Sequence, residues 1–155
     1  MLHEPPRHDT RAMLIAVDSY DHQVPAGELF YPAREERRSF VGLTQLLLQM
    51  DACMEAEDAP QAFQAERTFF PLVKPVPEEH IEKAWRIGKC STFTIAVLYR
   101  RNSSWQGKLT WLETGETERF RSVLELVHLL NSAMTKQELI PLFQTDSEQI
   151  LGKAE

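Results

Sequence analysis

The residues with the clearest potential for chemistry lie in one stretch, between positions 83 and 112. This stretch contains six basic residues and no acidic one, namely Lys83, Arg86, Lys89, Arg100, Arg101 and Lys108. Aromatic residues are interleaved with them, at Trp85, Phe93, Tyr99, Trp105 and Trp111. A β-sheet that exposes aromatic rings and cations can stack single-stranded bases and hold phosphates. The stretch therefore predicts a binding role rather than a reaction.

Residues that could support catalysis or hold a metal do not form a recognisable pattern. The five histidines are spread along the chain, and Cys53 and Cys90 match no metal or redox spacing. No nucleotide-binding glycine motif occurs, and the chain has only six glycines. Adjacent acids such as Glu35 and Glu36 are expected to be solvated, since acid–base catalysis requires a shielded cleft. We expect no enzymatic activity, no cofactor and no metal.

Composition indicates an ordinary globular protein. The 155 residues fit one domain, with 43% hydrophobic and 26% charged residues. The net charge of −6 argues against a general nucleic-acid binder. Two cysteines without a disulfide spacing favour a reducing, cytoplasmic setting. We expect no membrane span, because the longest apolar run, 46–48, has three residues. We also expect no secretory signal, because an apolar core is missing near the N-terminus.

The chain contains an internal repeat. Residues 13–54 align with 93–134 without a gap, and nine of the aligned positions are identical. Predicted turns align with turns, and apolar helix positions align with apolar helix positions. Periodicities of this kind are best sought before a fold is assigned. The repeat predicts two copies of one structural unit.

Each unit is expected to contain a β-hairpin and a helix. In the second unit, alternating apolar residues predict strands from Phe93 and from Trp105, with a turn at 102–104 between them. Ser122 and Glu125 have the spacing of a capping box, which predicts a helix start. The first unit has the same pattern, with Gly42 in place of the serine.

The predicted fold class is α+β, a two-layer sandwich built from an internally duplicated β-β-α unit. Its single domain, 1–155, begins with a flexible tail, 1–10, and the first ββα repeat, 13–54. A connecting segment, 55–92, with a short helix at about 77–87, leads to the second repeat, 93–134. A short helix and tail, 135–155, follow. Both long helices should cover one face of an antiparallel sheet.

Even-numbered strand positions form the other face of this sheet, and they are not cleanly polar. A sheet with one solvated face usually alternates more strictly. The connecting segment or the C-terminal helix could cover this face. It could also be a protein interface, either in a homodimer or with another chain.

The second hairpin is the predicted contact surface. It presents Arg100, Arg101, Trp105 and Lys108, with Leu98 and Leu112 nearby. An exposed tryptophan beside arginines is typical of a protein-binding hot spot. We therefore expect a small non-enzymatic interaction or regulatory protein that binds another protein. The alternative is a nucleic-acid-binding module that uses the same hairpin, which would bind with a steep salt dependence. A third hypothesis is an enzyme with a composite site at a homodimer interface, which would require a deep pocket with at least one strongly perturbed titratable group.

Overall fold

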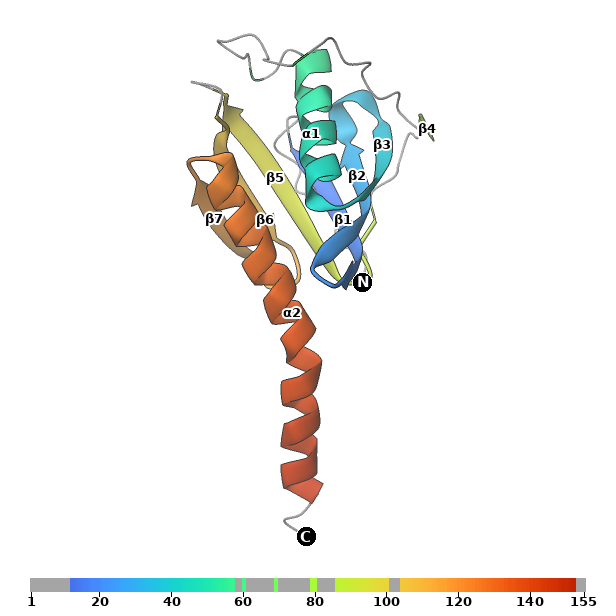
Figure 1. Cartoon of the computed structure of the whole chain (residues 1–155), viewed down its shortest axis with the longest axis vertical. Helices are drawn as coiled ribbons and strands as arrows, with labels where there is room; N and C mark the ends of the chain where they lie inside the picture. The colour runs from blue at the N-terminus through green and yellow to red at the C-terminus, as the bar shows by residue number, and fades with distance from the viewer. Residues whose placement is uncertain are drawn as a thin grey trace.

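The protein is an antiparallel β-sheet with two helices on one face (Figure 1). The computed structural model describes residues 12–57, 60, 69, 79–80, 86–100 and 104–152, with only the backbone for 79–80 and 138–152. The strands are β1 (Met13–Asp21), β2 (Val24–Tyr31), β3 (Glu36–Val41), β4 (Glu79–His80), β5 (Ser91–Tyr99), β6 (Gln106–Trp111) and β7 (Glu116–Phe120). Their order across the sheet is β4-β3-β2-β1-β5-β6-β7. The predicted α+β class is confirmed.

Each half of the chain has three long strands before its helix, so the predicted β-β-α unit is wrong in this respect. The additional strands, β3 and β7, continue the sheet outward from β2 and β6. Both carry charged residues on the face turned toward the helices, such as Glu36 and Glu116, which conceals the apolar alternation that identifies a strand. Charged side chains are common on strands near a sheet edge.

The core lies between the sheet and the helices α1 (Leu43–Glu57) and α2 (Val123–Gly152). Helix α1 packs over β2 and β3, and α2 packs over β6 and β7. The odd-numbered strand residues face the helices as predicted, and none of them is more than 7% exposed: Ile15, Val17, Leu29, Tyr31, Ile95, Val97, Leu109 and Trp111. Burying apolar side chains of this size provides most of the favourable free energy of folding.

The strand pairings of the first half recur at the aligned positions of the second half. Val17 pairs with Gly27, and Val97 pairs with Gly107. A register shift directly follows the valine in both pairs. Each glycine is required by a close backbone approach, since a Cβ at Gly27 or Gly107 would overlap a carbonyl oxygen of the neighbouring strand. The central pair, β1 with β5, is antiparallel.

The helix starts confirm part of the capping prediction. The backbone N–H of Glu125 donates to Ser122 Oγ over 3.2 Å. The Glu125 carboxylate accepts from the backbone N–H of Arg121, over 2.7 Å, rather than from that of Ser122. Gln45 accepts from the backbone N–H of Val41 in the same way at the start of α1. Ser122 therefore satisfies one of the free N-terminal donors of α2, while Gln45 and Glu125 bind the chain just before each helix.

Two predicted segments differ from the structure. Helix α2 is continuous to Gly152 and extends past the sheet (Figure 1), where the sequence indicated a separate short helix after Met134. The sequence has no glycine between Met134 and Gly152 at which the helix could end, and α2 continues through Pro141, a residue that removes one backbone hydrogen bond from a helix. Most of the predicted helix at 77–87 lies outside the described residues, and Glu79 and His80 pair with β3 as β4. The predicted tail, 1–10, also lies outside them.

Among the described residues, no helix has both the length and the apolar character that crossing a lipid bilayer requires.

Candidate functional site

Of the six residues predicted to form a contact surface, the five that the structure describes do not share one exposed surface. Lys108 is exposed and Leu98 and Leu112 are half-buried, while Trp105 is 8% exposed and belongs to the core. Arg100 is 3% exposed. Arg101 lies outside the described residues.

A β-bulge explains why Arg100 is buried. The register shift between Val97 and Tyr99 changes which residues of β5 face the helices. Arg100 then reaches α1, where its Nη1 lies 2.7 Å from Glu55 and 3.5 Å from Asp51. Its Nε donates to the carbonyl oxygen of Pro60 over 2.7 Å. The prediction that Arg100 is an exposed contact residue is wrong. In the structure Arg100 connects the second half of the chain to helix α1.

The aromatic residues of the basic stretch are mostly enclosed. Phe93, Trp105 and Trp111 are at most 8% exposed, and Phe93 stacks on Trp111 with a ring-centroid distance of 6.5 Å. Tyr99 is 51% exposed. Trp85 lies outside the described residues. The described aromatic rings therefore offer little surface on which bases could stack.

The two edges of the sheet differ, as Figure 1 shows. On one side, β4 pairs with β3, with His80 opposite Glu36 and Glu79 opposite Arg37. On the other side, no strand within the described part of the chain pairs with the free side of β7. An edge strand presents unpaired backbone N–H and C=O groups that can pair with another chain.

An ion-pair network fills the space between β3 and α1 in the first half. The Glu36 carboxylate is 3% exposed and receives two guanidinium groups. Arg34 Nε donates to Glu36 Oε1 over 2.8 Å, and Arg38 Nη2 donates to Oε2 over 3.1 Å. Arg34 also pairs with Glu57 near the end of α1. Such charge-assisted hydrogen bonds satisfy a carboxylate that the fold has removed from water.

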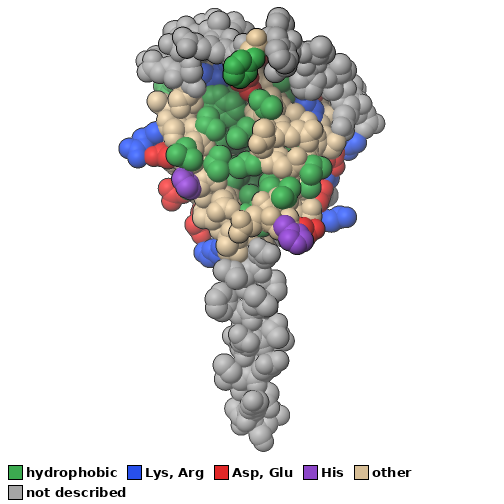
Figure 2. All heavy atoms as spheres, in the orientation of Figure 1, with side chains coloured by type: hydrophobic (Ala, Val, Ile, Leu, Met, Phe, Trp, Pro, Cys, Tyr) green, Lys and Arg blue, Asp and Glu red, His purple; other side chains and the backbone are tan. Residues whose placement is uncertain are grey.

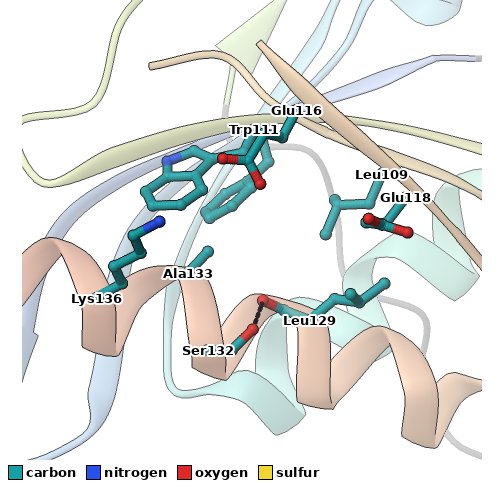
Figure 3. Close-up of a pocket in the computed structure, with 9 residues that line it drawn as sticks. Leu109, Trp111, Glu116, Glu118, Leu129, Ser132, Ala133 and Lys136 are labelled. Carbon is teal, nitrogen blue, oxygen red and sulfur yellow. Dashed lines mark hydrogen bonds between the residues drawn. The ribbon is translucent and has the colours of Figure 1, made fainter. Parts of the chain in front are cut away.

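The corresponding space between β7 and α2 in the second half is a pocket of about 160 Å³ (Figure 3). Carboxylates of Glu116 and Glu118 line it from β7, and Lys136 lines it from α2. The remaining lining is mainly apolar and consists of Phe93, Leu109, Trp111, Leu129, Ser132 and Ala133. Neither Glu116 nor Glu118 forms an ion pair in the described part of the chain. The pocket therefore combines an aromatic wall with two solvent-exposed acids and one lysine.

Trp111 is the central residue of this pocket. It is 7% exposed, and its indole Nε1 has no hydrogen-bond partner among the described residues. The Nζ of Lys136 lies over its ring, 5.9 Å from the centroid. This distance is within the range of a cation–π interaction. The ring surface at the pocket is therefore able to accept a cation.

The perturbed titratable groups lie elsewhere and indicate no catalytic pair. Hydrogen bonds from Arg86 lower the pKa of Asp18, and Arg86 also contacts Glu28 on the sheet face away from the helices. Burial raises the pKa of the Cys53 thiol to about 11 and that of Tyr31 to about 12. A buried thiol with a raised pKa is a poor nucleophile. No group of three potential metal ligands occurs within the described residues.

The helix-bearing face also has an apolar area between α1 and α2. Figure 2 shows apolar side chains across the middle of this face and charged side chains along its margins. Leu48 of α1 and Leu124 of α2 are 63% and 64% exposed. Single exposed leucines are common on soluble proteins.

Sequence reasoning missed the pocket residues Glu116, Glu118 and Lys136. Glu116 and Glu118 alternate with Thr117 and Arg119. This period of two indicates a strand and would place both glutamates on one face of it. Comparison with family models, curated proteins and solved structures finds no match to this chain. The candidate site therefore depends on its geometry alone.

Proposed function

We propose that this protein is a non-enzymatic interaction protein that binds an extended segment of another protein along the open edge of β7. The observation that carries the proposal is the difference between the two edges of the sheet. On one edge, β4 pairs with Glu36 and Arg37 of β3, whereas β7 has no strand partner on its outer side in the described residues. Addition of a strand to an open edge is a recurring mode of peptide recognition.

The orientation of Thr117 supports this use of the edge. Its hydroxyl lies 2.9 Å from that of Thr110 on β6. In antiparallel sheets, side chains approach most closely in pairs that share no backbone hydrogen bonds. The backbone N–H and C=O of Thr117 are then directed toward the open edge. A docked strand would bond to these groups as well as to those of Arg119, two residues further on.

Charge favours a different protein over a second copy of this chain. A fully overlapping antiparallel pair of β7 strands would place Glu118 opposite Glu118, and like charges in that position are destabilising. A partner strand with basic residues would instead complement Glu116 and Glu118. Homodimerisation and nucleic-acid binding are therefore alternative outcomes of the test.

The predicted outer-face residues lie close to this edge. Lys108 of β6 pairs with Arg119 of β7, so it lies one strand away from a docked segment. A contribution of Lys108, Leu98 and Leu112 to partner binding stays a prediction. Neither Cys53 nor Cys90 forms a disulfide among the described residues, which supports a reducing compartment such as the cytoplasm.

We also infer that the two halves of the chain arose by duplication of one unit. Support comes from the strand pairings that recur at aligned positions of 13–54 and 93–134. A second unit that lacks an edge strand equivalent to β4 would have its edge available for a partner.

The test is affinity capture from native lysate with nuclease treatment, using three versions of the full chain. Thr117→Pro removes the outward N–H, whereas Thr117→Val keeps it and serves as the matched control. We expect the wild type and Thr117→Val to retain a protein in stoichiometric amount and Thr117→Pro to lose it. A shared melting temperature shows that the proline variant is folded.

Retention by all three chains would overturn the assignment to the β7 edge. Retention that vanishes with nuclease would favour nucleic acid, and self-association of the purified chain that Thr117→Pro abolishes would favour a homodimer.

A further inference from the structure

Equivalent positions in the two halves of the chain differ beneath the helices. In the first half, Glu36 lies between two arginines, Arg34 and Arg38, and all three belong to the network under α1. At the aligned positions of the second half, a glutamate is retained as Glu116, but the arginine positions hold Thr114 and Glu118. The second half therefore keeps the acceptor and lacks the two cations.

The connecting turn shows that the backbone at this point is also similar. Glu35 has a left-handed backbone with φ of 53°, and Gly115, its equivalent, has φ of 75°. Arg34 extends from this turn to the Glu36 carboxylate in the first half. The side chain of Thr114 is too short to do the same, and its hydroxyl instead hydrogen-bonds near the turn, to the backbone N–H of Glu116.

The space that the arginines fill in the first half corresponds to the pocket in the second half (Figure 3). Its volume is about 160 Å³. A protein cavity of about 150 Å³ can hold a benzene molecule, so this pocket has room for a guanidinium group and part of its aliphatic stem.

We infer that this pocket takes the guanidinium group of an arginine side chain, supplied by the partner segment that docks on β7. This inference rests on the proposed function. Alternate side chains of a strand point to the same face. A strand beside β7 would therefore direct every second side chain toward the helices, next to Glu116 and Glu118.

The chemistry of the lining favours arginine over lysine. A planar guanidinium can donate to two carboxylates at once and can also stack on the face of an indole, whereas an ammonium group is a compact, strongly hydrated charge. Glu116 and Glu118 supply the carboxylates, and Trp111 supplies the ring. The indole N–H of Trp111 has no hydrogen-bond partner among the described residues. Because it is a donor, as the guanidinium is, it requires an acceptor from the partner segment, such as a backbone carbonyl, and not the guanidinium itself.

Lys136 regulates access to this pocket. Its ammonium group lies over the Trp111 ring, at 5.9 Å from the centroid. It therefore occupies the ring face that an incoming guanidinium would use, and it adds a like charge. Lys136 is exposed, so its flexible side chain can move into solvent when an arginine enters.

The experiment titrates the full chain with N-acetyl-arginine amide and follows the indole N–H resonance of Trp111 by NMR. The resonance is assigned with Trp111→Phe. The matched control ligand is N-acetyl-citrulline amide, which has the same shape without the charge. We expect saturable shifts with a dissociation constant on the order of 1 mM for the arginine compound, and none for citrulline.

Two variants locate the effect in the pocket. Glu116→Gln should weaken binding about tenfold, through loss of a charge-assisted hydrogen bond. Lys136→Met should strengthen it by about threefold, through loss of a competing charge. Equal shifts from citrulline, an absence of shifts with arginine, or no effect of Glu116→Gln would overturn the inference.

This result is separable from the test of the β7 edge. Thr117→Pro removes the outward N–H and the hydroxyl contact with Thr110, but no group that lines the pocket, so it should retain binding of the small arginine compound. Partner capture that depends on Thr117, without arginine binding, would retain the edge and reject the pocket. Arginine binding without capture that depends on Thr117 would retain the pocket and reject the β7 edge.

Discussion

Tyr20 on β1 donates a hydrogen bond from its hydroxyl to Asn131 Oδ1 on α2, over 2.5 Å. Tyr20 aligns with Arg100 in the repeat, and Asn131 aligns with Asp51. Arg100 and Asp51 also contact each other, with 3.5 Å between Nη1 and Oδ1. Each central strand therefore ends in a side chain that binds the helix of the opposite half. These two contacts join the halves across the middle of the sheet, in addition to the pairing of β1 with β5.

Replacing Arg100 should destabilise the fold. Arg100→Met leaves the carboxylates of Asp51 and Glu55 without their cation, and breaking a fully buried pair costs roughly 3–5 kcal/mol. Since Glu55 and Asp51 are 27% and 29% exposed, water compensates in part, and we expect a loss of about 2 kcal/mol. Urea unfolding measures it. Arg119→Met, at an exposed position, is the control and should change stability by less than about 0.5 kcal/mol. Equal effects of the two variants would contradict this role of Arg100.

The ion pair between Asp18 and Arg86 should make the free energy of unfolding depend on pH. The hydrogen bond from Arg86 lowers the folded-state pKa of Asp18 below its usual value of about 3.9. Its stabilisation is therefore complete above the unfolded-state pKa and is lost as the pH falls through the folded-state value. Asp18→Asn should be less stable than the wild type near neutral pH, and the gap should close in acid. Urea unfolding across this pH range measures the difference in stability between the two chains. A difference that does not change with pH would contradict a stabilising ion pair between Asp18 and Arg86.

The two cysteines should react at different rates. Burial raises the pKa of the Cys53 thiol to about 11, so little thiolate is present near pH 8. We expect Cys90, which is half-buried, to react first with a thiol-specific disulfide reagent, and Cys53 to react only after unfolding in urea. Cys90→Ser isolates the slow thiol. Rapid labelling of Cys53 in the folded Cys90→Ser chain would contradict its enclosed position.

Substitution of Gly107 should be more costly than substitution of Gly115. A Cβ at Gly107 would overlap the backbone carbonyl of Ala96, and rigid backbone cannot move aside cheaply. Gly115 has open space around it and a φ of 75°, so alanine there is strained only in its backbone. We expect losses of about 3 kcal/mol for Gly107→Ala and about 1 kcal/mol for Gly115→Ala. Thermal unfolding ranks the two variants, and the opposite order would contradict the register of β5 and β6.

The fold class was predictable because exposed and buried positions alternate along most of β5 and β6, and because β1 and β2 align with these two strands. β3 and β7 were not, because their helix-facing positions hold Glu36, Arg38, Glu116 and Glu118. In β3, the charges neutralise one another in a network that depends on distant parts of the chain, including Glu57. A sequence pattern does not contain that information.

The positions of individual site residues were harder to predict. A bulge changes the facing of the residues that follow it in β5, so Arg100 could not be assigned to a face from alternation alone. Trp105 follows the odd-numbered alternation of β6 and is buried, and its expected exposure came from its place near the tip of the hairpin. The pocket results from a difference between two halves whose backbones pair alike. It becomes visible only when Glu116 is compared with Glu36 and its arginines in three dimensions.

Amide hydrogen exchange of the chain, alone and with its captured partner bound, tests the central claim most directly. Strand addition protects backbone N–H groups at the edge that it covers. We predict slower exchange across Glu116–Phe120 in the complex, centred on Thr117 and Arg119, and little change at Glu36 and Arg37 of β3, which already pair with β4. Protection confined to the helices α1 and α2, with β7 unchanged, would contradict the proposed binding mode.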